Sequence, residues 1–94
     1  MQATAPMRRD GDALVFTGAL TRDAVPALWA TATPALDGVR RFELSAVEQL
    51  DSAGLALLAE LAERAGGVAV TGEPRGLPEL RRAYRLSPAL SFHA

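Results

Sequence analysis

The sequence predicts a small α/β domain, in which a mixed β-sheet of about four strands is covered by about three helices in the order β-β-α-β-α-β-α. Three observations predict it. An Asp-Gly turn separates two short alternating segments near the N-terminus, and further strand-like segments then alternate with segments of helical periodicity. The third is size: 94 residues, 49% of them apolar, suffice for one two-layer domain over residues 1–94 but not for a deep substrate cavity.

The N-terminal segment should form a hairpin. Asp10-Gly11 is a turn signal between two short segments, Met7–Arg9 and Ala13–Thr17. Leu14 and Phe16 occupy alternate positions, as in a strand with one buried face. Because strand–helix–strand units pair in parallel through right-handed crossovers, the hairpin should add one antiparallel edge strand to a parallel sheet.

A helical stripe follows Gly18. Thr21 or Asp23 could cap its start, but Pro26 is tolerated only in a first turn, so the exact start of this helix stays open. Asp37-Gly38 should end it. The apolar positions recur at spacings of three and four residues and are Val25, Leu28, Trp29, Ala32 and Leu36.

A third strand is predicted over Arg40–Ser45, where Phe42 and Leu44 point to one face. A loop, Ala46–Asp51, should then lead into Ser52–Arg64, the best helical segment of the chain.

The last third of the chain should contain a short strand and a short helix. Gly66-Gly67 is typical of a helix C-terminus, and Val68 and Val70 indicate the fourth strand. The last helix should begin near Pro78, a favoured first position. Its inward-facing residues are predicted to be Leu80, Ala83 and Tyr84.

Charge and composition exclude several classes of protein. Ten arginines, with no lysine, against eleven acidic residues give a net charge of −1, so bulk electrostatics predicts no binding to nucleic acid or anionic lipid. The absence of cysteine excludes disulfides and Cys-based zinc sites. No apolar run is long enough to span a membrane, and no secretion signal is visible, so we expect a cytoplasmic protein.

Catalytic chemistry is poorly supported. The only histidine, His93, is the penultimate residue, which leaves a serine nucleophile without a base. Glu43, Glu48 and Asp51 are most simply solvated carboxylates, and no glycine spacing matches a phosphate-binding loop. We therefore expect no enzyme activity, no cofactor and no metal site. On the last helix, Arg81, Arg82 and Arg85 form a solvated face, with docking to an acidic partner as the alternative.

The start of the Ser52–Arg64 helix is the most specific feature. Asp51 and Ser52 precede or open the first turn, where free backbone N–H groups favour an oxygen ligand. Gly54 costs about 1 kcal/mol relative to alanine there, which makes sense if another group must approach closely. The simpler alternative is that Ser52 is only the N-cap and Gly54 only a packing accommodation.

A helical wheel divides this helix into a core face and an outer face. The core face should hold Leu55, Leu58, Ala59, Leu61, Ala62 and Ala65. On the outer face, Glu60 and Arg64 form an i,i+4 pair, and Leu57 is predicted to lie exposed among alanines as a docking patch. The candidate partner-binding residues are Asp51, Ser52, Ala53, Ala56, Leu57 and Glu60.

The segment Leu50–Leu58 resembles the signature of STAS domains, the fold of bacterial anti-sigma factor antagonists and of sulfate-transporter tails. The order of elements agrees over essentially the whole chain. In the antagonists, the serine matched by Ser52 is phosphorylated by a partner kinase. This resemblance implies that Ser52 is a candidate phosphorylation site, although Ala53 replaces a second Ser or Thr seen in several antagonists.

The MlaB-like group of STAS proteins is more similar. Gly18–Trp29 resembles its first helix region, and Leu80–Leu86 resembles its C-terminal segment. The resemblance implies a cytoplasmic, non-enzymatic subunit that binds the ATPase of a phospholipid-transporting ABC transporter through the region of Ser52. It would contact the inner face of the inner membrane only through that partner. The alternative is an anti-sigma factor antagonist whose partner is an anti-sigma factor kinase.

Overall fold

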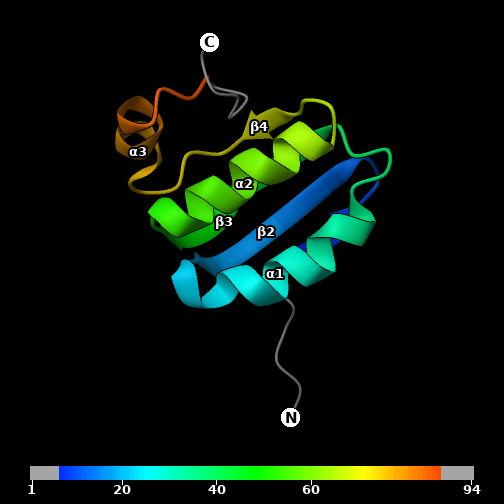
Figure 1. The fold of residues 1–94 in the computed structure, drawn as a ribbon. Helices are drawn as coiled ribbons and strands as arrows, with labels where there is room; N and C mark the ends of the chain where they lie inside the picture. The colour runs from blue at the N-terminus through cyan, green and yellow to red at the C-terminus, as the bar shows by residue number, and fades with distance from the viewer. Residues whose placement is uncertain (1–6, 88–94) are drawn as a thin grey trace.

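A four-stranded mixed sheet carries the helices on one face (Figure 1). The computed structural model describes residues 7–87. The spatial order of the strands is β1-β2-β3-β4, with β1 antiparallel to β2 and the other pairs parallel. The strands are β1 (Met7–Asp10), β2 (Ala13–Leu20), β3 (Arg41–Leu50) and β4 (Ala69–Thr71), and the helices are α1 (Val25–Ala32), α2 (Ser52–Arg64) and α3 (Leu77–Ala83).

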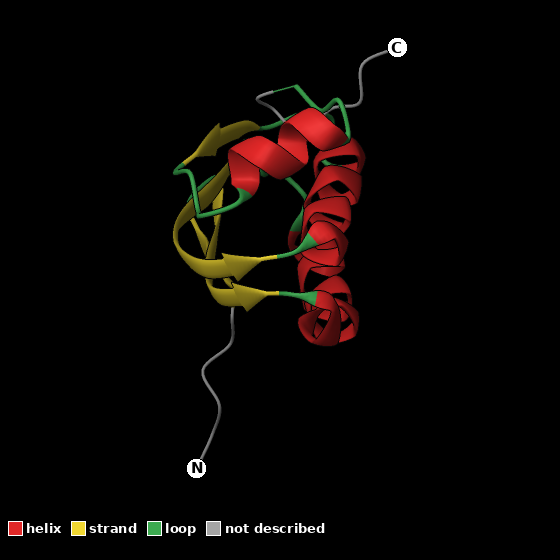
Figure 2. Ribbon diagram, turned by 90° about the vertical axis from the view of Figure 1, so that its left-hand side faces the viewer, coloured by secondary structure: helices red, strands yellow, loops and turns green. Residues whose placement is uncertain are grey.

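The order of elements and the antiparallel edge confirm the fold predicted from the sequence. The helices α1 and α2 lie side by side over the sheet, and α3 lies on the other side of α2 from α1 (Figures 1 and 2). The core between sheet and helices contains Phe16 and Phe42, whose rings meet edge to face with centroids 5.4 Å apart. Leu58 and Leu61 of α2 are buried in the same cluster, so α2 is anchored directly over the sheet.

The third strand is longer than predicted. The expected loop at Ala46–Asp51 is wrong, because β3 continues to Leu50 and pairs there with Leu20 of β2. Its pairing with β2 shifts register at two irregularities, one of them next to Gly18, whose φ is +74°. Each shift resets which residues face inward, so the simple alternation that marks a strand is lost beyond Ser45.

The first helix is shorter than its apolar stripe. A 3₁₀ turn, Arg22–Ala24, precedes α1, and Pro26 lies in its first turn as predicted. Neither Thr21 nor Asp23 caps α1 through its side chain. The helix ends at Ala32 because Pro34 lacks the amide proton that a continuing helix needs, and a 3₁₀ turn over Thr33–Ala35 follows.

The last helix begins close to Pro78, as predicted, but its burial differs from the prediction. Tyr84 was expected to point inward and is instead 48% exposed, and Ala83 is also exposed. Tyr84 follows the last helical residue, and Arg85 takes a left-handed φ of +57°, so helical periodicity does not extend to this point. Leu77 and Leu86 anchor the segment in the core instead.

Within residues 7–87, no helix combines the length and the apolar character that crossing a membrane requires.

Candidate functional site

Asp51 caps the start of α2. Its carboxylate accepts a hydrogen bond from the backbone N–H of Gly54 at 2.9 Å and another from that of Arg22 at 3.0 Å. These two hydrogen bonds hold the pKa of Asp51 below its ordinary value, because they stabilise the ionised carboxylate. The bond from Gly54 has the larger effect. Asp51 therefore joins the start of α2 to the segment that precedes α1, and Ser52 is not the N-cap.

Gly54 allows α2 to begin in contact with the end of β2. A Cβ atom at this position would collide with the carbonyl oxygen of Leu20. The same carbonyl accepts a hydrogen bond from the backbone N–H of Asp51 at 3.3 Å. The close approach inferred from a glycine in the first turn is confirmed, and the approaching group is the backbone of Leu20.

Ser52 lies exposed on the first turn of α2. Within residues 7–87, its hydroxyl makes no hydrogen bond to another protein group. The capping role is already filled by Asp51, so the hydroxyl of Ser52 remains available to a partner or to a modifying enzyme.

Leu57 is buried, and the prediction that it forms an exposed patch is wrong. It is only 4% exposed and belongs to the same core cluster as Leu28 and Ala32 of α1. The helical wheel assumed one covered face, whereas α2 is covered by the sheet below and by α1 at its side (Figure 1). The buried arc of α2, from Leu57 round to Ala59, spans about 200° of the helix.

The exposed residues of α2 are Ser52, Ala56, Glu60, Glu63 and Arg64. The first three lie along one stripe of the helix, which we call the α2 stripe. Glu60 forms the predicted ion pair with Arg64, with Nε and Oε2 3.6 Å apart. The guanidinium of Arg64 also lies over the ring of Trp29 of α1, 4.8 Å from its centroid. The far end of the stripe is thus tied to α1, while its start is open.

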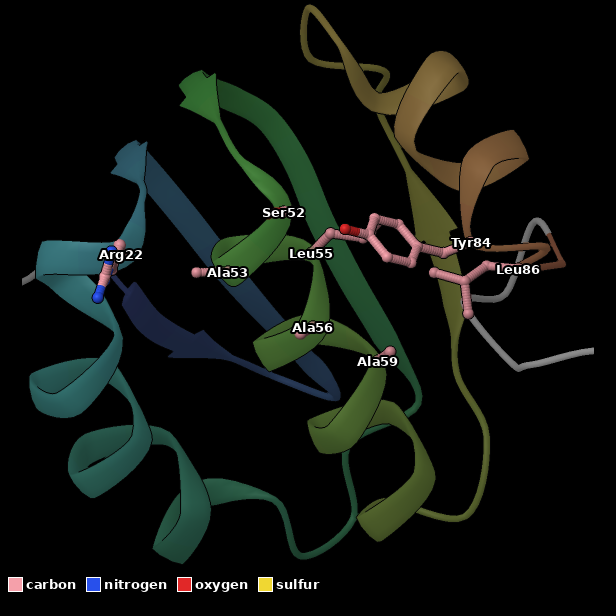
Figure 3. Close-up of a pocket in the computed structure, with 8 residues that line it drawn as sticks. All are labelled: Arg22, Ser52, Ala53, Leu55, Ala56, Ala59, Tyr84 and Leu86. Carbon is pink, nitrogen blue, oxygen red and sulfur yellow. The ribbon is translucent and has the colours of Figure 1, made fainter.

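A hollow of about 350 Å³ opens beside the start of the α2 stripe (Figure 3). It exists because the α2 residues between the flanking segments are small, so α2 fills little of the space there. Tyr84 extends from the end of α3 towards Leu55, and Arg22 lies on the opposite side of α2 (Figure 3). The lining consists of Arg22, Ser52, Ala53, Leu55, Ala56, Ala59, Tyr84 and Leu86.

The hollow brings together half of the predicted partner-binding set. Ser52, Ala53 and Ala56 line it, and Asp51 lies directly beside it as the cap of α2. Glu60 lies farther along the α2 stripe and Leu57 beneath the surface, so neither lines the hollow.

Five lining residues were not predicted as partner contacts. Leu55 and Ala59 were assigned to the core face of the helix, and the other three are Arg22, Tyr84 and Leu86. No local pattern marks Arg22, because its position depends on a hydrogen bond to Asp51, 29 residues away. For Tyr84 a signal did exist, since the resemblance of Leu80–Leu86 to a known segment singled out this stretch, but helical periodicity assigned its side chain to the core.

The polar groups of the lining are a guanidinium, a serine hydroxyl and a phenol, all of which can donate hydrogen bonds. The rest of the lining is aliphatic. Within residues 7–87, no three His, Cys, Asp or Glu side chains gather in a way that could hold a metal ion. The arrangement suits binding of a partly apolar group by burial and hydrogen bonding.

Comparisons with known proteins identify the family of the chain. The family model described as "Mlab, STAS domain" matches residues 4–90. The chain is 34% identical over 65 residues to the intermembrane phospholipid transport system binding protein MlaB of Escherichia coli (strain K12), a match that covers 69% of this chain and 67% of that relative. The protein of the same description from Shigella flexneri matches with the same identity and coverage.

Proposed function

The chain belongs to the MlaB STAS domain family, and from this premise we propose that it is the STAS component of an intermembrane phospholipid transport system. In this role it binds the ATPase subunit of the ABC transporter and supports the assembly and activity of the complex. It catalyses no reaction itself. It works in the cytoplasm, held at the inner face of the inner membrane by the ATPase.

The observation that carries the proposal is the exposed Ser52 hydroxyl beside the hollow. Ser52 has no partner within residues 7–87, the adjacent floor is formed by Ala53 and Ala56, and Tyr84 is left 48% exposed across the hollow. Tyrosine is enriched among residues that dominate the binding energy of protein interfaces, because its ring buries a large apolar area while its hydroxyl forms a hydrogen bond. A partner side chain that enters the hollow would bury Tyr84 and hydrogen-bond to Ser52.

Co-purification with the ATPase of the same organism's transporter tests this proposal. We expect that Ser52→Glu and Ala56→Glu each abolish co-purification, because each places a carboxylate at the hollow, while Ser52→Ala weakens it only modestly. The matched control is Ala30→Glu, which adds the same charge at an exposed alanine of α1 outside the hollow. Retention of the ATPase by both glutamate variants would contradict the proposal. Leu57→Glu is unsuitable, because it would place a charge in the core.

The second candidate function is that of an anti-sigma factor antagonist, switched by a kinase that phosphorylates Ser52. The exposure of Ser52 and its free hydroxyl favour it, since a kinase needs both. A phosphate would add nearly two negative charges beside the ionised Asp51 and repel an acidic partner surface. Intact-mass measurement of the protein from its native host, with no phosphate found under any growth condition, would exclude this alternative.

A further inference from the structure

The carboxylate of Asp51 gives one oxygen to each of two segments. Its Oδ1 accepts a hydrogen bond from the backbone N–H of Gly54 in α2, and its Oδ2 accepts one from that of Arg22, 29 residues earlier in the chain. The first bond caps the helix, which is the common role of an aspartate at this position. The second bond is not needed for the cap, and it holds the Arg22–Ala24 turn to the start of α2.

The Arg22–Ala24 turn has little buried surface to keep it in place. None of its three residues is buried, and Arg22 and Asp23 are exposed. Thr21, which precedes the turn, makes no side-chain cap. A segment with so little buried surface opens locally at a low free-energy cost, so the hydrogen bond to Asp51 has a large influence on where the turn lies.

The position of this turn sets one side of the hollow. Arg22 lines the hollow, and Ala53 of α2 points towards the Arg22 side (Figure 3). A guanidinium group carries several N–H donors, so it can bind carbonyl, hydroxyl or amide oxygens of a partner as well as carboxylates. The space between Arg22 and α2 therefore depends on Asp51, which does not itself line the hollow.

We propose that Arg22 contacts the partner protein and that Asp51 is the residue that positions it. Asp51 acts through the Arg22–Ala24 turn and does not touch the partner, so its role differs from the direct contact expected from the sequence. A contact group that is held in place before binding gives higher affinity, because less conformational entropy is lost when the complex forms. This inference rests on the proposed function, because the partner is the ATPase.

The variant Asp51→Asn separates the two hydrogen bonds. An asparagine side chain has one acceptor oxygen and one NH₂ donor, whereas an aspartate has two acceptor oxygens. The single oxygen can still cap α2 at Gly54, but the NH₂ group cannot accept a hydrogen bond from Arg22. We therefore expect amide hydrogen exchange in this variant to become about tenfold faster at Arg22 and to stay nearly unchanged at Gly54.

Titration calorimetry with the ATPase, on the full chain, tests whether Asp51 acts through Arg22. If the freed turn places Arg22 correctly for about a third of the time, Asp51→Asn should raise the Kd about threefold. Arg22→Ala should raise it about fivefold, because the contact itself is lost. The double variant should bind no more weakly than Arg22→Ala alone, since a positioning residue has no effect once the group it positions is absent.

The matched control is Asp23→Asn. It removes one negative charge from an exposed aspartate directly beside Arg22, without removing the hydrogen bond, and should bind like the unmodified chain. Thermal unfolding identifies a temperature at which every variant is fully folded, and the titrations are made there.

The outcomes separate this inference from the proposed function. Additive losses in the double variant would mean that Asp51 touches the partner directly, and unchanged affinity in Arg22→Ala would mean that Arg22 does not. Unchanged exchange at Arg22 in Asp51→Asn would show that Asp51 does not hold the turn. Each of these results overturns the inference while ATPase binding stands. If the unmodified chain does not bind the ATPase, the proposed function fails and this inference with it.

Discussion

The two walls of the hollow are held in place by different interactions. The wall formed by the start of α2 is fixed through the backbone, since Asp51 bonds two N–H groups and Gly54 lies against Leu20. The wall formed by the end of α3 belongs to a seven-residue helix whose N-cap, Gly76, makes no side-chain cap, and its main surface feature is the exposed Tyr84. Changes at the first wall should therefore reduce mainly the stability of the fold, whereas changes at the second should reduce the affinity for the partner protein.

The largest effect is expected at Gly54. Gly54→Ala should lower the free energy of unfolding by about 3 kcal/mol, because the added methyl group collides with the backbone of Leu20. At an exposed helical position without such a neighbour, the same change would raise it by about 1 kcal/mol. Urea denaturation measures the difference, with Ala56→Gly as the control for helix propensity alone. A stabilised Gly54→Ala variant would show that the first wall is not fixed by close contact.

Tyr84 tests the second wall. Tyr84→Ser should change the free energy of unfolding by less than about 0.5 kcal/mol, because half of the side chain is already exposed. It should weaken ATPase binding by about 2 kcal/mol, or about thirtyfold, as expected for an interface tyrosine. Isothermal titration calorimetry gives the affinity. A large loss of stability with unchanged affinity would reverse the roles assigned to the two walls.

A smaller effect on stability is expected from the cap. Asp51→Ala should lower the free energy of unfolding by about 1–2 kcal/mol, because the backbone N–H groups of Gly54 and Arg22 lose their acceptor. Asp51→Asn should cost less, since an asparagine side chain can still cap a helix. Equal losses for the two variants would mean that the charge, and not the hydrogen bonds, holds this wall.

The smallest expected effect is on the pH dependence of stability, to which the Asp51 cap in the first wall contributes. The pKa of Asp51 is lowered in the folded protein, so its contribution to stability is complete above the ordinary carboxyl range and is lost as the pH falls through the lowered pKa. Glu43, whose pKa is lowered by hydrogen bonds from Thr71 and Ser45, adds to this trend. Unfolding at a series of pH values below about 4.5 should show a shallower decline for Asp51→Asn than for the unmodified chain. Parallel declines would exclude this contribution of Asp51.

The same comparison explains which features of the fold and of the candidate site could be predicted from the sequence. Periodicity located α2 to the residue, because a 13-residue amphipathic helix over a sheet has a strong pattern. It failed for Leu57 and Tyr84, since the burial of each depends on a neighbouring helix or on where a short helix ends. Gly54 could be interpreted correctly because a glycine that lowers helix propensity needs a tertiary reason. Arg22 could not be predicted, because only the folded chain brings it to Asp51.

The central claim is that the start of the α2 stripe faces the ATPase. The most direct test places a photo-crosslinking amino acid at Ala56, which lines the hollow, and at Ala30, which is exposed on α1 outside it. Illumination of the complex in cells should link the chain to the ATPase subunit from position 56 and not from position 30. Crosslinks from position 30 alone, in a complex that forms normally, would contradict the claim.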